Sequence, residues 1–133
     1  MARVLIADSS EQYARACMRA LASEAHRVRW AATMGDAVEL ALRWHPELVL
    51  ASEVLDDGTA LELIERLDAE MGRERPLPPI AVMSSAPSLP AKMRVLWAGA
   101  TDYFGRPVPG HVLLGRVRVL LGTQIREAPP VAV

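Results

Sequence analysis

Short apolar runs alternate along this chain with longer segments whose apolar residues recur every three or four positions. Apolar runs cover residues 4–7, 48–51 and 80–83, and each suits a short buried strand. Residues 26–32, with Val28 and Trp30 on one face, and residues 102–104 are predicted as the two remaining strands. The segments between and after them, about 10–22, 33–46, 59–72, 90–98 and 109–122, have the spacing of amphipathic helices. This alternation predicts an α/β domain of five βα units, with a parallel sheet covered by helices on both faces.

Local signals place the ends of these helices. Ser9 with Gln12, and Thr59 with Glu62, have the spacing of a capping box, and Thr33 is a further N-cap candidate. Helix ends are predicted at Pro46, Gly99 and Gly122. We expect one domain over residues 1–121, followed by a flexible tail or the start of a linker over 122–133.

The bulk composition limits the classes of partner. The 133 residues carry a formal net charge of −1, which implies no general attraction to nucleic acid or to anionic membranes. The single cysteine, Cys17, excludes an internal disulfide framework and suits a reducing compartment. There is no apolar run of membrane-spanning length, and Asp8 comes too early for a signal peptide. A cytoplasmic location is expected.

Polar residues follow the predicted strands. Ligands of open α/β sheets meet the carboxyl ends of the strands, so these residues are candidates for a common site. They are Asp8 and Ser9, Ser52 and Glu53, Ser84 and Ser85, and Arg106. The alternative is that they are polar only because strand ends meet water and cap helices.

Four segments in order resemble the receiver domain of bacterial two-component response regulators, including the chemotaxis response regulator. They are VLIADSS, PELVLASEVLDDGTALEL, PIAVMSS and GATDYFGRP, and the resemblance covers about residues 2–121. It implies a doubly wound, flavodoxin-like (βα)5 fold with its five strands in the order 2-1-3-4-5.

The departures from the family pattern bear on function. The resemblance places Ser52 on the aspartate that accepts a phosphoryl group, Ser9 on the second residue of an acidic pair, and Arg106 on a lysine. Ser84 keeps a hydroxyl position, and Tyr103 keeps an aromatic switch position. A serine hydroxyl is a poor nucleophile without a base, and Mg²⁺ prefers carboxylate help. We therefore expect Arg106 to pair with Asp8, with no metal and no cofactor.

The expected function is that of a phosphorylation-independent pseudo-receiver, a protein–protein interaction or dimerisation module of phosphorelay signalling rather than an enzyme. The resemblance implies that the partner or second copy meets the face formed by the fourth helix, fifth strand and fifth helix. That face is expected to include Lys92, Arg94, Trp97, Asp102, Tyr103, Arg116 and Arg118. Trp97 suits an interface anchor if it is exposed, whereas it is a core residue if it packs inward beside Met93.

Other interpretations stay open. Glu53 is expected to point away from the pocket, because side chains alternate along a strand, but a bulge would bring it in to imitate a phosphoaspartate. Asp56 and Asp57 are expected to form a solvated turn. The rival functions are a receiver phosphorylated at Glu53, Asp56 or Asp57, and a small-ligand-binding domain of flavodoxin-like fold.

Overall fold

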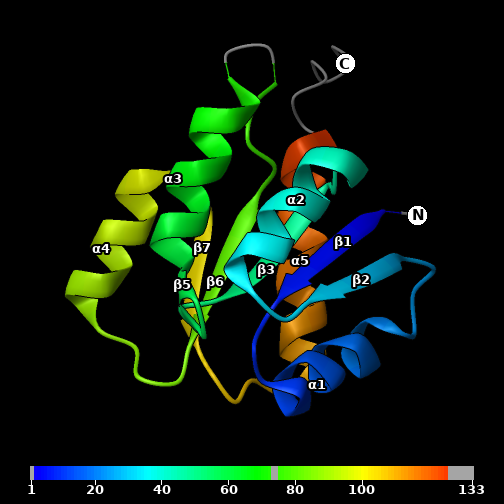
Figure 1. Cartoon of the computed structure of the whole chain (residues 1–133). Coiled ribbons are helices and arrows are strands. Elements are labelled where there is room, and N and C mark those ends of the chain that lie inside the picture. Colours follow the sequence, from blue (N-terminus) through cyan, green and yellow to red (C-terminus); the bar gives the residue numbers. More distant parts are fainter. Residues whose placement is uncertain (1, 73–74, 126–133) are drawn as a thin grey trace, which may run out of the picture.

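The computed structural model describes residues 2–72 and 75–125, which fold as a parallel sheet between two layers of helices (Figure 1). The elements in chain order are β1 (Arg3–Ala7), α1 (Glu11–Leu21), β2 (Arg27–Ala31), α2 (Met34–Trp44), β3 (Leu48–Ser52), β4 (Val54–Leu55), β5 (Gly58–Thr59), α3 (Ala60–Met71), β6 (Ile80–Ser84), α4 (Leu89–Ala98), β7 (Asp102–Gly105) and α5 (Gly110–Ile125). The five-stranded sheet has the order β2-β1-β3-β6-β7. Since β4 and β5 form a separate hairpin, this is the predicted 2-1-3-4-5 order.

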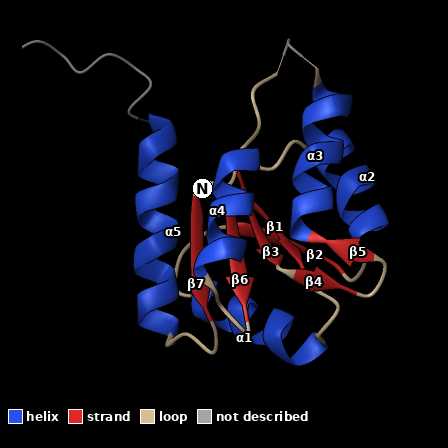
Figure 2. Ribbon diagram, turned by 90° about the vertical axis from the view of Figure 1, so that its left-hand side faces the viewer, coloured by secondary structure: helices blue, strands red, loops and turns tan. Residues whose placement is uncertain are grey.

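The two faces of the sheet bury separate cores. Helices α1 and α5 cover one face, and α2, α3 and α4 cover the other (Figure 2). Every residue of β3 and β6 is buried, because the central strands of a parallel sheet have helices on both sides. In the described part of the chain, no helix is long and apolar enough to cross a membrane.

Two of the predicted helix caps are confirmed and one is wrong. Thr33 Oγ1 accepts a hydrogen bond from Asp36 N, and Thr59 Oγ1 accepts one from Glu62 N, both at 3.1 Å. The first helix, however, is capped by Ser10, whose Oγ accepts from Tyr13 N at 3.2 Å. Ser9 does not cap it, because its hydroxyl is bonded to residues on other elements, as described below.

Helix α5 is longer than predicted. It runs through Gly122 and ends at Ile125, so the helix end predicted at Gly122 is wrong. Glycine in a helix interior costs only about 1 kcal/mol relative to alanine, so packing of the preceding turns can carry the helix past it. The rest of the predicted tail, residues 126–133, lies outside the described residues, and the domain boundary stays a prediction.

The hairpin β4–β5 was not predicted. Asp56 and Asp57 do form its exposed turn, but Asp57 also has a tertiary role. Its Oδ1 accepts from Met34 N at 2.6 Å and its Oδ2 accepts from Gly35 N at 3.0 Å, at the first turn of α2. These two backbone hydrogen bonds hold the pKa of Asp57 below its usual value, since they stabilise the carboxylate form. The hairpin is thereby tied to the start of α2.

Asp57→Asn is expected to lower the melting temperature at neutral pH. The two hydrogen bonds are accepted by the two oxygens of a charged carboxylate, whereas an amide is neutral and has only one acceptor oxygen. The folded-state pKa of Asp57 is lowered, so its stabilisation is present above the unfolded pKa and is lost as the pH falls through the folded pKa. The difference in melting temperature between wild type and variant should therefore shrink in acid. Asp56→Asn, at the neighbouring exposed position, is the control. A pH-independent difference would contradict this role.

Candidate functional site

Three side chains from three strand ends meet in one buried polar cluster. Asp8 follows β1, Ser52 ends β3 and Arg106 follows β7. Arg106 Nη1 donates to Asp8 Oδ2 at 2.5 Å, and Arg106 Nη2 donates to Ser52 Oγ at 2.8 Å. The Asp8 and Arg106 side chains are only 1% and 8% exposed. The salt bridge predicted between Arg106 and Asp8 is therefore confirmed.

Each of the three nitrogens of the Arg106 guanidinium group donates a hydrogen bond. Its third nitrogen, Nε, donates to Ser85 Oγ at 3.3 Å, and the Tyr13 ring lies against it, 3.9 Å from Arg106 Cζ to the ring centroid. A planar fork can bond acceptors on several strands at once, which a lysine ammonium on its flexible stem does not reproduce. Arg106 thus joins β1, β3 and β6 to the segment that follows β7.

The remaining polar atoms of the cluster are bonded as well. Asp8 Oδ1 accepts from Ser10 N at 2.9 Å, and the Asp8 carbonyl accepts from Trp30 Nε1 at 2.7 Å. Ser52 Oγ donates to Val54 O at 2.8 Å while it accepts from Arg106. In the described part of the chain, every buried side-chain nitrogen and oxygen has a hydrogen-bond partner. The cluster is closed and internally neutralised.

This donor set does not fit the Mg²⁺ that the receiver resemblance implies. Asp8 is the only carboxylate of the cluster, and it already faces a guanidinium. Across residues 2–72 and 75–125, no group of three or more His, Cys, Asp or Glu side chains is placed to hold a metal ion. Magnesium requires near-octahedral oxygen coordination, usually with carboxylates, and a guanidinium in the same space opposes it.

Ser9 and Ser84 lie close to the cluster, but their hydroxyl groups form hydrogen bonds with groups outside it. Ser9 Oγ donates to Ala32 O at 2.6 Å and accepts from Asp56 N at 2.9 Å, so it joins the start of α2 to the hairpin turn. Ser84 Oγ accepts from Ala86 N at 3.1 Å, and the Ser84 carbonyl accepts from Arg106 N at 2.9 Å. Both hydroxyls stabilise loops at the strand ends.

Glu53 contacts the aromatic residue at the switch position. It lies half-buried in the bend between β3 and β4, and its Oε2 accepts from the hydroxyl of Tyr103 at 3.3 Å. The same hydroxyl accepts from Ser88 N at 3.2 Å, and Tyr103 is 7% exposed. The Glu53 carboxylate is thus bonded to Tyr103 and makes no ion pair with Arg106. The Tyr103 side chain is thus held in a buried position by hydrogen bonds with Glu53, which follows β3, and with Ser88 N, which precedes α4.

Cys17, beneath the cluster on α1, is part of the core. Its side chain is 5% exposed and packs in the α1–α5 layer. Burial, together with the nearby negative charge of Asp8, raises the pKa of this thiol to about 11, although the positive charge of Arg106 opposes the shift. A thiol that stays protonated at neutral pH is a weak nucleophile.

The residues predicted for one interaction face lie on more than one surface of the protein. Arg116 Nη1 bonds Asp102 at 2.7 and 3.0 Å, and the guanidinium lies over Phe104, so these residues share the β7–α5 surface. Trp97 is 92% exposed, which decides against inward packing. Arg118 is not on this face as predicted, because it pairs with Glu24 after α1.

Sequence reasoning missed Tyr13, Trp30 and the partner of Ser85. Tyr13 lies in the first turn of α1, directly after the strand that carries Asp8, which places it near the strand ends; its contact with Arg106 is seen only in the structure. Trp30 lies on β2, and only the fold shows that its indole N–H reaches Asp8 O.

The chain is similar to known response regulators in sequence. It is 33% identical over 104 residues to the response regulator protein PilR of Pseudomonas aeruginosa, covering 78% of this chain and 22% of PilR. It is 31% identical over 121 residues to the KDP operon transcriptional regulatory protein KdpE of Escherichia coli, covering 91% of this chain and 52% of KdpE. The chain thus spans about half or less of these relatives. No protein-family model matches it.

Solved structures have the same fold. A CheY-like response regulator receiver domain protein from Methanospirillum hungatei matches with a TM-score of 0.87 and 26% identity, covering 96% of this chain and 99% of that one. A two-component response regulator from Clostridium difficile matches with a TM-score of 0.83 and 18% identity, covering 93% and 98%, and shows the fold alone. Similarity in sequence and in fold strongly supports a response-regulator receiver domain, of the CheY-like kind, for this chain.

Proposed function

We propose that this receiver-like domain works without phosphoryl transfer, as a protein–protein interaction or dimerisation module of a two-component or phosphorelay pathway. One observation carries the proposal: the Arg106 guanidinium bonds both Asp8 and Ser52. The receiver resemblance assigns a metal ligand to the first of these positions and the phosphoacceptor to the second. A built-in cation lies between them instead.

The chemistry of the cluster opposes transfer to Ser52. Among the described residues, Ser52 Oγ has two hydrogen-bond partners, Val54 O and Arg106 Nη2, and neither is a base that could take its proton. An incoming phosphoryl group and its cation would have to displace Arg106 from Asp8. Removing one partner of a buried ion pair costs about 3–5 kcal/mol, because a charge is left uncompensated.

The contacts of Tyr103 support a surface that is fixed rather than switched. In an active receiver, phosphate supplies the differential binding that moves the switch residues, and a shift needs such a difference. Here the Tyr103 hydroxyl is held by hydrogen bonds with groups of the protein itself, Glu53 Oε2 and Ser88 N. Partner recognition is assigned to the face formed by α4, β7 and α5, where Lys92, Asp102 and Arg116 supply charge for specificity.

The proposal is tested by incubating the protein with acetyl phosphate and Mg²⁺ and measuring its intact mass. No phosphoryl adduct is expected, whereas a conventional receiver treated in parallel should gain one. An adduct that is labile in acid and base would overturn the proposal. Its loss in Glu53→Gln, Asp56→Asn or Asp57→Asn would then identify the acceptor and support the rival function, a receiver that uses a non-standard carboxylate.

A further inference from the structure

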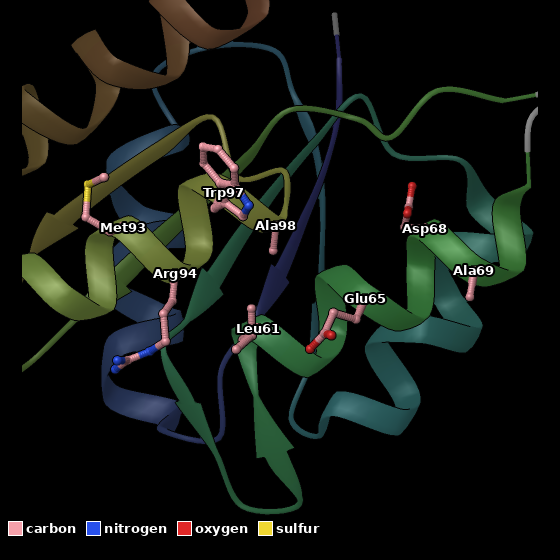
Figure 3. A pocket seen from close by; sticks show the side chains of 8 residues that line it. All are labelled: Leu61, Glu65, Asp68, Ala69, Met93, Arg94, Trp97 and Ala98. Carbon is pink, nitrogen blue, oxygen red and sulfur yellow. The ribbon is translucent and has the colours of Figure 1, made fainter.

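A groove of about 690 Å³ lies between α3 and α4, apart from the polar cluster and beside the β7–α5 surface (Figure 3). Residues of both helices line it: Leu61, Glu65, Asp68 and Ala69 from α3, and Met93, Arg94, Trp97 and Ala98 from α4. Figure 3 shows Leu61 and Ala98 between the two helices, with Met93 and Trp97 projecting from α4. The floor is apolar, and the rims carry charge.

Helix α4 exposes an apolar stripe, of which Met93 and Trp97 line this groove. Leu89, Met93 and Trp97 follow one another at four-residue spacing, which places them on one side of the helix, and they are 67%, 55% and 92% exposed. Exposed apolar patches rimmed by polar residues mark interaction sites more often than ordinary surface. Tryptophan is also the residue type most enriched among binding hot spots.

The two walls of the groove differ in charge. Glu65 and Asp68 on α3 are exposed, and neither side chain forms a hydrogen bond or a salt bridge with another described residue. Helix α4 contains no acidic residue, and of its two exposed cations, which stand on either side of Met93, Arg94 lines the groove and Lys92 lies outside its lining. Nor does Lys92 or Arg94 pair with a carboxylate in the described part of the chain.

We propose that the occupant of the α3–α4 groove is α4 of a second copy of this chain. A helix that fits here needs an apolar stripe for Leu61 and Trp97, flanked by cations for Glu65 and Asp68. The stripe of α4, flanked by Lys92 and Arg94, has this pattern. Under two-fold symmetry each copy supplies one α4 and one acidic wall, so the contact is self-complementary. Helices in such a groove pack through interdigitating side chains.

This interface shares α4 with the α4–β7–α5 face but not β7 or α5, and it does not depend on whether the domain accepts a phosphoryl group. Its failure would therefore leave the phosphorylation result unchanged. Sedimentation velocity at protein concentrations from about 1 μM to about 1 mM measures the association over dissociation constants in that range. We expect a reversible dimer. In NMR spectra, the indole N–H signal of Trp97, identified by its absence in Trp97→Phe, should shift with protein concentration.

Charge-swapped variants test the assigned contacts. Glu65→Lys with Asp68→Lys, and Lys92→Glu with Arg94→Glu, should each weaken dimerisation at least about tenfold, as should Trp97→Ala. Mixing the two charge-swapped proteins should restore a dimer, because each acidic α4 then meets a basic α3 wall. Glu39→Lys, at an exposed position on α2, makes the same charge change as each α3 substitution, away from the groove, and should leave dimerisation unchanged. Circular dichroism checks that each variant is folded.

Three results would overturn the proposal. The first is a chain that stays monomeric throughout the concentration range. The second is a dimer that Trp97→Ala does not weaken or that the mixed charge-swapped pair does not restore. The third is a dimer that depends on Arg116, since Arg116→Glu acts on the β7–α5 surface and not in the groove.

Discussion

Arg106→Met is expected to lower the free energy of unfolding by about 3–5 kcal/mol, because it leaves the buried Asp8 carboxylate without its cation. The substitution keeps much of the side-chain volume while it removes the bonds to Asp8, Ser52 and Ser85. Urea denaturation followed by circular dichroism measures the loss, provided that the transition is two-state.

Two comparisons isolate the cause of this loss. Asp8→Asn added to Arg106→Met removes the stranded charge, so the double variant should recover part of the stability, and the two changes should not be additive. Arg116→Met breaks a more exposed pair, with side chains 42% and 25% exposed, and should cost only about 0–1 kcal/mol. Equal losses at Arg106 and Arg116 would contradict the role given to the buried cluster.

Phosphoryl uptake is expected only when Ser9→Asp, Ser52→Asp and Arg106→Lys are combined. Together with Asp8, the first two changes supply carboxylates for Mg²⁺ and for the acceptor, and the third removes the fork that now fills the site. Ser52→Asp alone should give none, because Arg106 would bind the new carboxylate as it binds Asp8. The single change should also cost about 1–2 kcal/mol, since a carboxylate cannot donate to Val54 O.

Intact mass after treatment with acetyl phosphate and Mg²⁺ distinguishes the two variants. Mg²⁺ alone should raise the melting temperature of the triple variant in a saturable way and leave that of Ser52→Asp unchanged, since only a ligand of the native state stabilises it. Efficient phosphorylation of Ser52→Asp alone would mean that Ser9 and Arg106 do not prevent metal binding.

The order of the main elements could be predicted from the sequence, because the central strands are short apolar runs and amphipathic segments with cap or stop residues separate the strands. The hairpin β4–β5 could not, since strands of two residues have no measurable periodicity. Asp57-Gly58 is a hairpin signal, but two polar residues in a loop suggest a solvated turn equally well. The contact of Asp57 with α2 requires the tertiary structure.

The candidate site was predictable only in part. Asp8 and Arg106 follow strands whose carboxyl ends lie at one edge of the sheet, and opposite charges brought to one edge are expected to pair. The contacts of Tyr13 and Glu53 depend on the rotation of α1 and on the bend after Ser52, which local sequence does not determine. The side of α4 that Trp97 occupies depends likewise on packing: Ala91 and Val95 of this helix are buried, and this turns Trp97 outward.

The hydroxyl of Ser9 bears on how such a domain evolves. It donates to Ala32 O and accepts from Asp56 N, so an aspartate at this position would lose the donated bond and face a carbonyl with a negative charge. A lineage that acquires acidic residues one at a time therefore loses stability before it gains any phosphoryl chemistry to be selected. From this sequence, mutation reaches new binding surfaces more easily than it reaches an active phosphoacceptor site.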